Sequence, residues 1–252
     1  MISVSSPALS LMPLDQAIEK VAEDFRAWEI VAEGRHRLPE IEKRFREMSG
    51  SFDLEYSVHA PLSDINIGSL NPSIREASLK EVLLAIECCG RIGIDLITVH
   101  PGFISPLGQL DREAVIRETR NSIKQIDKAA SENGVVAALE NMPRMPITTC
   151  TGPTELLSLM EGTSLGICFD IGHAHTNGNI DDFVKHVPSF ANVHIHDNNA
   201  NSDQHLAIGE GTIDFDHVLS AMGGYRRRYV IEARRIETAT LSLSRLKKLL
   251  DR

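Results

Sequence analysis

The strongest constraint on the fold is a regular alternation between two kinds of segment along all 252 residues. Short runs rich in β-branched and apolar residues have the length and composition of buried strands. Longer amphipathic stretches with helical spacing separate these runs. Such alternation predicts a parallel sheet whose faces are covered by helices. The expected strands lie at about residues 2–5, 28–33, 54–59, 95–100, 135–140, 165–170, 192–197 and 229–233.

The amphipathic stretches carry boundary signals that agree with helices. Asp111 and Thr151 stand where N-caps are expected, and Gly90 and Gly134 stand where helices should stop. Together with the periodicity, these signals define where the clearest helices should lie. The expected helices cover residues 13–25, 74–90, 112–134 and 240–250.

Eight strand–helix units match a (β/α)8 TIM barrel, an α/β fold that takes about 250 residues. The main alternative is an open, doubly wound sheet. However, no GxGxxG motif follows the first expected strand, and no Walker lysine loop occurs in the chain. No linker or low-complexity segment divides the sequence. We therefore expect one TIM-barrel domain over residues 1–252.

The expected strands share a second regularity, because six successive ones end in His, Asp or Glu. In a barrel the carboxyl ends of all strands meet at one rim, where active sites are built. Side chains alternate along a strand, so His194 and His196 share a face, as do Glu232 and Arg234. The strand-end residues are His59, His100, Glu140, Asp170 followed by His173, His194 with His196 and Asp197, and Glu232.

Such a concentration of ionisable residues indicates a metal site. Converging carboxylates would repel one another and lose hydration, unless a cation neutralised them. A bound divalent ion removes both penalties. Mixed imidazole and carboxylate ligands suit zinc, manganese, iron or cobalt better than calcium.

Five segments at or near the strand ends carry a family resemblance. They are HPG from His100, EN from Glu140, FDIGHAH from Phe169, HIHDNNANSDQHLAIGEGTIDF from His194, and IEA around Glu232. These segments resemble the xylose-isomerase-like barrel superfamily, which includes endonuclease IV and many sugar or sugar-phosphate isomerases and epimerases. The resemblance covers nearly the whole chain.

The resemblance implies a set of metal ligands, with zinc favoured and manganese, cobalt or iron as alternatives. Endonuclease IV relatives bind three zinc ions through nine ligands, whereas one ion suffices in epimerase relatives. The epimerase pattern implies the quartet Glu140, Asp170, His194 and Glu232. The nuclease pattern implies His59 and His100 at one ion with Glu140 bridging, Asp170, His194 and Glu232 at the second, and His173, Asp203 and His205 at the third.

The leading functional hypothesis is a divalent-metal-dependent isomerase or epimerase. Its substrate would be a small sugar, sugar phosphate or polyol-derived molecule, and the reaction a proton transfer through a metal-stabilised enediolate. Glu140 and Glu232 would take and return the proton. His196 or His175 would polarise a substrate hydroxyl, and Arg234 could clamp a phosphate or carboxylate.

Two alternatives remain open at this point. One is a zinc phosphodiesterase of the endonuclease IV type, which acts on abasic DNA. The loop after His59, HAPLSDINIGSLN, has no aromatic residue to insert into a duplex. A net charge of −9, from 26 basic and 35 acidic residues, also disfavours nucleic acid as a partner. The other alternative is a non-catalytic metal-binding barrel.

Features outside the site indicate a cytoplasmic protein. No apolar run reaches the ~18 residues of a membrane span, and the first residues lack the basic start of a signal peptide. Four cysteines show no paired spacing, which is typical of a reducing compartment. Related barrels often dimerise, so a homodimer is an open expectation.

Overall fold

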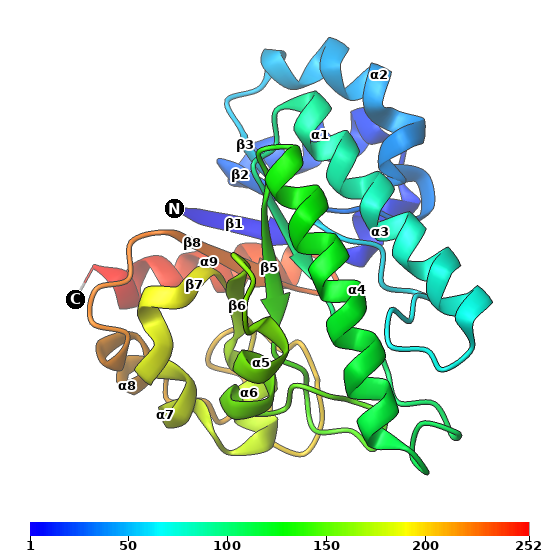
Figure 1. Ribbon diagram of the computed structural model, residues 1–252. Helices are drawn as coiled ribbons and strands as arrows, with labels where there is room; N and C mark the ends of the chain where they lie inside the picture. The colour runs from blue at the N-terminus through cyan, green and yellow to red at the C-terminus, as the bar shows by residue number, and fades with distance from the viewer. Residues whose placement is uncertain (252) are drawn as a thin grey trace.

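A computed structural model describes residues 1–251 as eight parallel strands that close into a barrel. Each strand pairs with its neighbours in sequence, and β1 pairs with β8 to complete the ring (Figure 1). The predicted TIM barrel is therefore confirmed. The strands are β1 (Ile2–Ser5), β2 (Ala27–Val31), β3 (Glu55–His59), β4 (Leu96–Val99), β5 (Val136–Glu140), β6 (Gly166–Asp170), β7 (Phe190–Ile195) and β8 (Arg228–Glu232).

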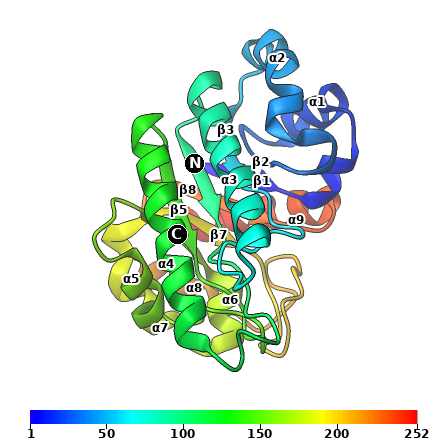
Figure 2. The ribbon, with the colours of Figure 1, turned by 45° about the vertical axis from the view of Figure 1, so that its right-hand side comes forward.

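Helices surround the barrel, and α3 and α4 run side by side along one flank (Figures 1 and 2). Short 3₁₀ segments η1 (Pro7–Leu11), η2 (Gly34–His36), η3 (Ser49–Ser51) and η4 (Val184–Ser189) complete the connections. The α-helices are α1 (Leu14–Asp24), α2 (Leu38–Met48), α3 (Pro72–Ile92), α4 (Arg112–Glu132), α5 (Pro153–Met160), α6 (Ile171–Asn177), α7 (Ile180–Phe183), α8 (Phe215–Ala221) and α9 (Ile236–Leu250).

Helix boundaries follow the capping signals in part. Asp111 is the N-cap of α4, and its carboxylate accepts a hydrogen bond from the backbone N–H of Ala114. Gly134 follows the end of α4 with a φ of 67°. The sequence predicted Thr151 as an N-cap, but the N-cap of α5 is the next residue, Gly152.

The prediction that Gly90 ends a helix is wrong. Helix α3 continues to Ile92 and ends at Gly93, which has a φ of 77°. A Cβ atom at position 90 would lie 2.7 Å from the backbone oxygen of Asn133. Gly90 therefore lets α3 pack closely against the end of α4, and this packing partner lies far away in the sequence.

The barrel has an apolar outer layer and an unusually polar interior. On the outside, Phe169 stacks against Phe183 and Phe190, with ring centroids 5.4 and 4.8 Å apart. Branched apolar residues dominate most barrel interiors. Here hydrogen bonds join the inward side chains of Ser57, Thr98 and Asn192 to the buried carboxylate of Glu29. This polar layer lies beneath the rim that carries the candidate ligands.

Among residues 1–251, no helix combines the length and the apolar character that crossing a membrane would require.

Candidate metal centre

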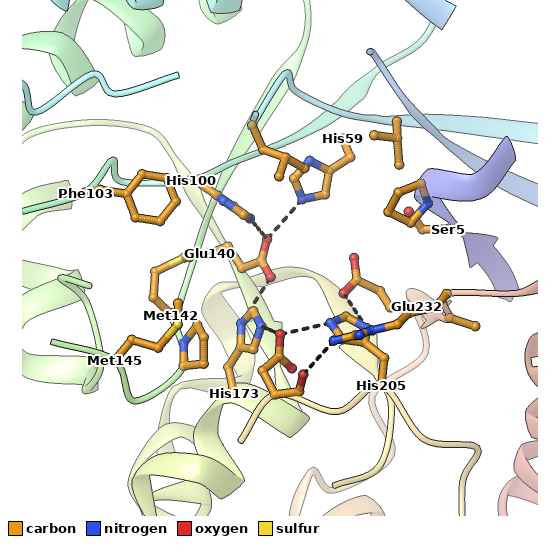
Figure 3. Close-up of a pocket in the computed structure, with 17 residues that line it drawn as sticks. Ser5, His59, His100, Phe103, Glu140, Met142, Met145, His173, His205 and Glu232 are labelled. Carbon is orange, nitrogen blue, oxygen red and sulfur yellow. Dashed lines mark hydrogen bonds and ion pairs between the residues drawn. The ribbon is translucent and has the colours of Figure 1, made fainter. Parts of the chain in front are cut away.

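A cavity of about 260 Å³ opens at the carboxyl ends of the strands. One part of its wall is apolar and includes Phe103, Met142 and Met145 (Figure 3). The other part consists of ionisable side chains, so the cavity joins an apolar wall to a highly charged floor. The candidate ligands that line it are His59, His100, Glu140, His173, Asp203, His205 and Glu232.

The nine ligands that the sequence suggested lie together at this rim, in three groups whose donor atoms are within 4.8 Å of one another. Glu140 belongs to both the first and the second group. His196, expected to contact substrate, lies with the third group. The first group is His59, His100 and Glu140; the second is Glu140, Asp170, His194 and Glu232; the third is His173, His196, Asp203 and His205.

The first group is centred on one oxygen of Glu140. The Nε2 atoms of His59 and His100 lie 3.4 and 3.1 Å from Glu140 Oε2, and Figure 3 shows both rings pointing at this carboxylate. The Nδ1 atom of His59 contacts the backbone oxygen of Ala60 at 2.9 Å. Because a carbonyl oxygen only accepts, Nδ1 carries a proton, and the lone pair of the neutral ring lies on Nε2.

In the second group, two carboxylates face one imidazole nitrogen. The Nδ1 atom of His194 lies 3.4 Å from Glu140 Oε1 and 3.1 Å from Glu232 Oε1. The opposite nitrogen, Nε2, lies 3.0 Å from Glu29 Oε1. A carboxylate behind the ring holds the proton on Nε2 and directs the Nδ1 lone pair towards the rim.

The third group combines a helix, a strand end and a loop. His173, on α6, uses Nδ1 to donate to the backbone oxygen of Asn141 at 2.8 Å, and its Nε2 lies 3.6 Å from Asp203 Oδ2. The Nε2 atoms of His205 and His196 lie 3.0 and 3.4 Å from the two oxygens of the same carboxylate.

These residues fit a divalent ion. Two donor atoms that each lie ~2.1 Å from one tetrahedral ion are roughly 3.4 Å apart, which matches most of the contacts in all three groups. Buried polar atoms also lack hydrogen-bond partners within residues 1–251, including Glu140 Oε2, Asp170 Oδ2 and His194 Nδ1. Glu140 Oε2 and His194 Nδ1 have ion-pair contacts of 3.1 Å or more, so a shared cation would satisfy atoms that are otherwise poorly bonded.

The density of charge shifts the pKa values of the site. Burial, the largest influence, lowers the pKa of His59, but Glu140 and other carboxylates outweigh it and raise the value to about 9. Burial likewise opposes the effect of Asp170 and Asp203 on His173, whose pKa rises to about 10. The pKa of Glu140 falls well below its usual range despite burial, because imidazoles surround it. Without an ion, the site is thus held together by protonated imidazoles and carboxylates.

The three residues expected to bind substrate lie in different surroundings. Arg234 lines the cavity, and its Nη2 donates to the backbone oxygen of Asp203 at 3.2 Å. His196 is fully buried and lies outside the described lining of the cavity. His175 is also absent from that lining, and its Nε2 contacts the hydroxyl of Thr212 at 3.1 Å.

Glu29 was missed by the sequence reasoning. It is fully buried in the middle of β2, where its carboxylate contacts His194 and accepts hydrogen bonds from Ser57 and Asn192. The sequence did contain a signal for a buried, paired carboxylate, because a glutamate interrupts the otherwise apolar run AWEIV. Charged residues are almost never fully buried unless they are paired.

Comparisons with known proteins identify relatives that match most of this chain. An uncharacterised protein of Methanocaldococcus jannaschii, MJ1311, is 36% identical, and the match covers 98% of this chain and 88% of that protein. A probable endonuclease 4 of Aquifex aeolicus is 28% identical over 70% of this chain and 68% of its own length.

Among solved structures, one described as a D-tagatose 3-epimerase-like protein is 35% identical, with a TM-score of 0.92 and coverage of 99% of this chain and 97% of that one. The IolI protein, solved with a bound zinc atom, is 18% identical, with a TM-score of 0.77 and coverage of 99% of this chain and 95% of that one. At this identity the likeness shows the fold alone. The family model of the xylose isomerase-like TIM barrel matches residues 18–249. The chain therefore belongs to the xylose isomerase-like TIM barrel family.

Proposed function

We propose that this protein is a divalent-metal-dependent isomerase or epimerase of a small sugar, sugar phosphate or polyol-derived substrate. One observation carries the proposal: Glu140 and Glu232 both face Nδ1 of His194, at 3.4 and 3.1 Å, in the floor of a small cavity. Proton transfer at a carbon needs one group to remove the proton and another to return it. The carboxylates of Glu140 and Glu232, which both face Nδ1 of His194, provide such a pair.

The chain's own residues account for the other requirements. Glu140 would remove the proton beside a substrate carbonyl, and Glu232 would return one from the other side. An ion bound at the second group would polarise that carbonyl and stabilise the negative charge that develops. Arg234, exposed at the edge of the cavity, would bind an anionic end such as a phosphate. Phe103 would pack against the apolar face of a sugar ring.

The similarity to a D-tagatose 3-epimerase-like protein supports sugar chemistry. Zinc is the favoured ion, because imidazole and carboxylate ligands are typical of zinc sites. Manganese, cobalt and iron also suit a site of one imidazole and three carboxylates. The four cysteines are all free and buried, which agrees with a reduced cytoplasmic setting.

The direct test is proton exchange at substrate carbon. Protein loaded with Zn²⁺, Mn²⁺ or Co²⁺ is incubated with ketoses and ketose phosphates in deuterated water, and the products are followed by NMR. We expect deuterium to enter next to the carbonyl of at least one ketose, together with its epimer or aldose isomer. Full metal loading with no exchange on any member of the panel would refute the proposal.

The first and third groups favour a second candidate, hydrolysis of a phosphodiester. Isomerisation does not require His59, His100 or the third group, whereas a multinuclear centre suits an attack on phosphorus. The endonuclease 4 relatives point the same way. Turnover of bis(p-nitrophenyl) phosphate or incision of an abasic duplex would favour this candidate. We expect neither, with duplex binding no tighter than ~10⁻⁵ M at physiological salt, because the net charge is −9.

A further inference from the structure

The third group differs from the first in the number of side chains it contains. The first group has three members, whereas the third has four, His173, His196, Asp203 and His205. The second group also has four, but three of them are carboxylates, whereas three of the four in the third group are imidazoles, the more usual ligands of structural zinc. Structural zinc sites have four protein ligands, and catalytic sites keep one position open. We propose that the third group binds a structural ion, that His196 is its fourth ligand, and that this ion fastens the loop of residues 197–213 at the cavity mouth. The inference depends on metal binding and not on the reaction proposed above.

The position of His196 carries the proposal. Its ring is fully buried, and neither nitrogen has a hydrogen-bond partner within residues 1–251. Its Nε2 lies 3.3 Å from Asp170 Oδ1 and 3.4 Å from Asp203 Oδ1. The ring stacks on His205 with centroids 4.0 Å apart and an interplanar angle of 15°. A buried imidazole whose Nε2 has only ion-pair contacts of 3.3 Å or more, and whose Nδ1 has no partner within residues 1–251, is costly unless a ligand satisfies one of the nitrogens. The convergence with three other donors identifies that ligand as a cation.

The chain leaves space for the ring of His196 in this position. A Cβ atom on Gly172 would lie 2.1 Å from Cε1 of His196, much closer than atoms can approach. Gly172 has no positive φ that would require glycine, so the need for space explains the residue. The sequence segment IGHAH thus combines the glycine that accommodates one ligand with His173, which is another.

The loop that carries the other two ligands has a backbone ladder at its base, and nearer its tip Arg144 and Arg234 donate to the backbone oxygens of Ala200 and Asp203. Asp197 and Leu206 exchange backbone hydrogen bonds of 3.0 and 2.8 Å, and the Asp197 carboxylate accepts from the N–H groups of Gly209 and Gly211. His205 has a left-handed φ of 52°, which is unfavourable for a residue other than glycine.

An ion in the third group would connect the tip of this loop to α6 through His173 and to the end of β7 through His196. Asp203 and His205 both line the cavity. Fixing them would therefore give the cavity wall a permanent shape.

Retention of zinc tests the inference. Zinc-loaded protein is dialysed against a weak chelator, and zinc is measured per chain. We expect wild type to retain one ion and His196→Ala to lose it, with at least a ~10-fold weaker affinity. His217→Ala is the matched control, because this exposed histidine pairs with Asp181 on the outer helices and should not alter retention. Unchanged affinity in His196→Ala would overturn the proposal.

Cobalt spectroscopy on wild type decides the question even if His196→Ala does not fold. The first equivalent of Co²⁺ should give the strong visible absorption of a tetrahedral site, and added inorganic phosphate should not change it. Weak octahedral absorption, or a spectral change with phosphate, would contradict a closed site. These readouts involve no turnover, so a protein without sugar chemistry could still pass them, and an active enzyme could fail them.

Discussion

The Nε2 atom of His194, a member of the second group, lies 3.0 Å from the carboxylate of Glu29, and both side chains are fully buried. Glu29 also accepts hydrogen bonds from Ser57 and Asn192, so its orientation is fixed from β3 and β7. Carboxylates that contact the outer nitrogen of a metal-binding histidine orient the ring and increase its basicity. Glu29 is therefore expected to act through His194 and not by touching substrate.

Glu29→Gln should weaken metal binding at the second group by about 10–100-fold, because the amide lacks the charge that holds the proton on Nε2. Competition with a fluorescent chelator measures the affinity. Glu55→Gln is the control, since this carboxylate lies at the other end of the barrel, 3.7 Å from Arg228. Equal affinities for Glu29→Gln and Glu55→Gln would show that Glu29 is only a buried structural residue.

Glu140→Gln and Glu232→Gln should separate metal binding from proton transfer. Each variant loses a charged ligand, so affinity should fall by about 10–100-fold or more. At saturating metal, the remaining defect should be roughly 10²–10⁴-fold in rate, because an amide cannot accept the proton. His186→Ala and His217→Ala, on the outer surface, should leave both properties nearly unchanged. Normal metal binding and full activity in Glu232→Gln would remove this residue from the site.

Metal affinity should rise with pH between about 7 and 9. In the metal-free protein, Glu140 and neighbouring carboxylates outweigh burial and raise the pKa of His59 to about 9, and similar neighbours raise that of His173 to about 10. Both rings are therefore protonated at pH 7, and an incoming ion must displace these protons. Each displaced proton adds up to roughly a tenfold increase in affinity per pH unit.

Calorimetry in buffers of different ionisation enthalpy should accordingly detect proton release on zinc binding at pH 7. His36 should not contribute, because burial lowers its pKa to about 4 and it is already neutral in this range. Affinity that stays constant from pH 7 to pH 9 would contradict the expectation that protonated imidazoles hold the metal-free site together.

Gly172→Ala should displace the ring of His196, since the added Cβ would lie 2.1 Å from it. We expect a loss of the tightly held ion and a decrease of about 1–3 kcal/mol in the free energy of unfolding, as for other overpacked cores. Zinc content and thermal unfolding measure the two effects. Gly50→Ala is the control, because apart from Gly50 and its two chain neighbours no atom of the described chain lies within 4 Å of a Cβ at that position. A Gly172→Ala protein that keeps its ion would show that the ring can move without losing its role.

Much of this protein could be predicted from its sequence, because the informative signals are local. Strand and helix periodicities are set by neighbouring residues, and eight repeats of the pattern are enough to indicate a barrel. The ligands could be proposed for the same reason. Residues at the ends of parallel strands, such as His100 and Glu140, must meet at one rim. Here the Nε2 atom of His100 lies 3.1 Å from Oε2 of Glu140.

Other features depend on contacts between distant parts of the chain, and only the tertiary structure decided them. Gly90 has the appearance of a helix end but serves to bring α3 close to Asn133. Glu29 reaches His194 across the barrel, although the two residues are 165 positions apart in number and no local pattern links them.

His196 is the clearest case. By alternation along its strand it should face the interior, which the sequence predicts and the structure agrees with. An inward imidazole at this position could line the cavity or join the buried third group. The outcome depends on the loop that folds over the ring and on the space left by Gly172. The sequence by itself thus determined the barrel and the chemical character of its rim. The tertiary structure decided which donors share a group, because that depends on loop packing and on close contacts that periodicity does not encode.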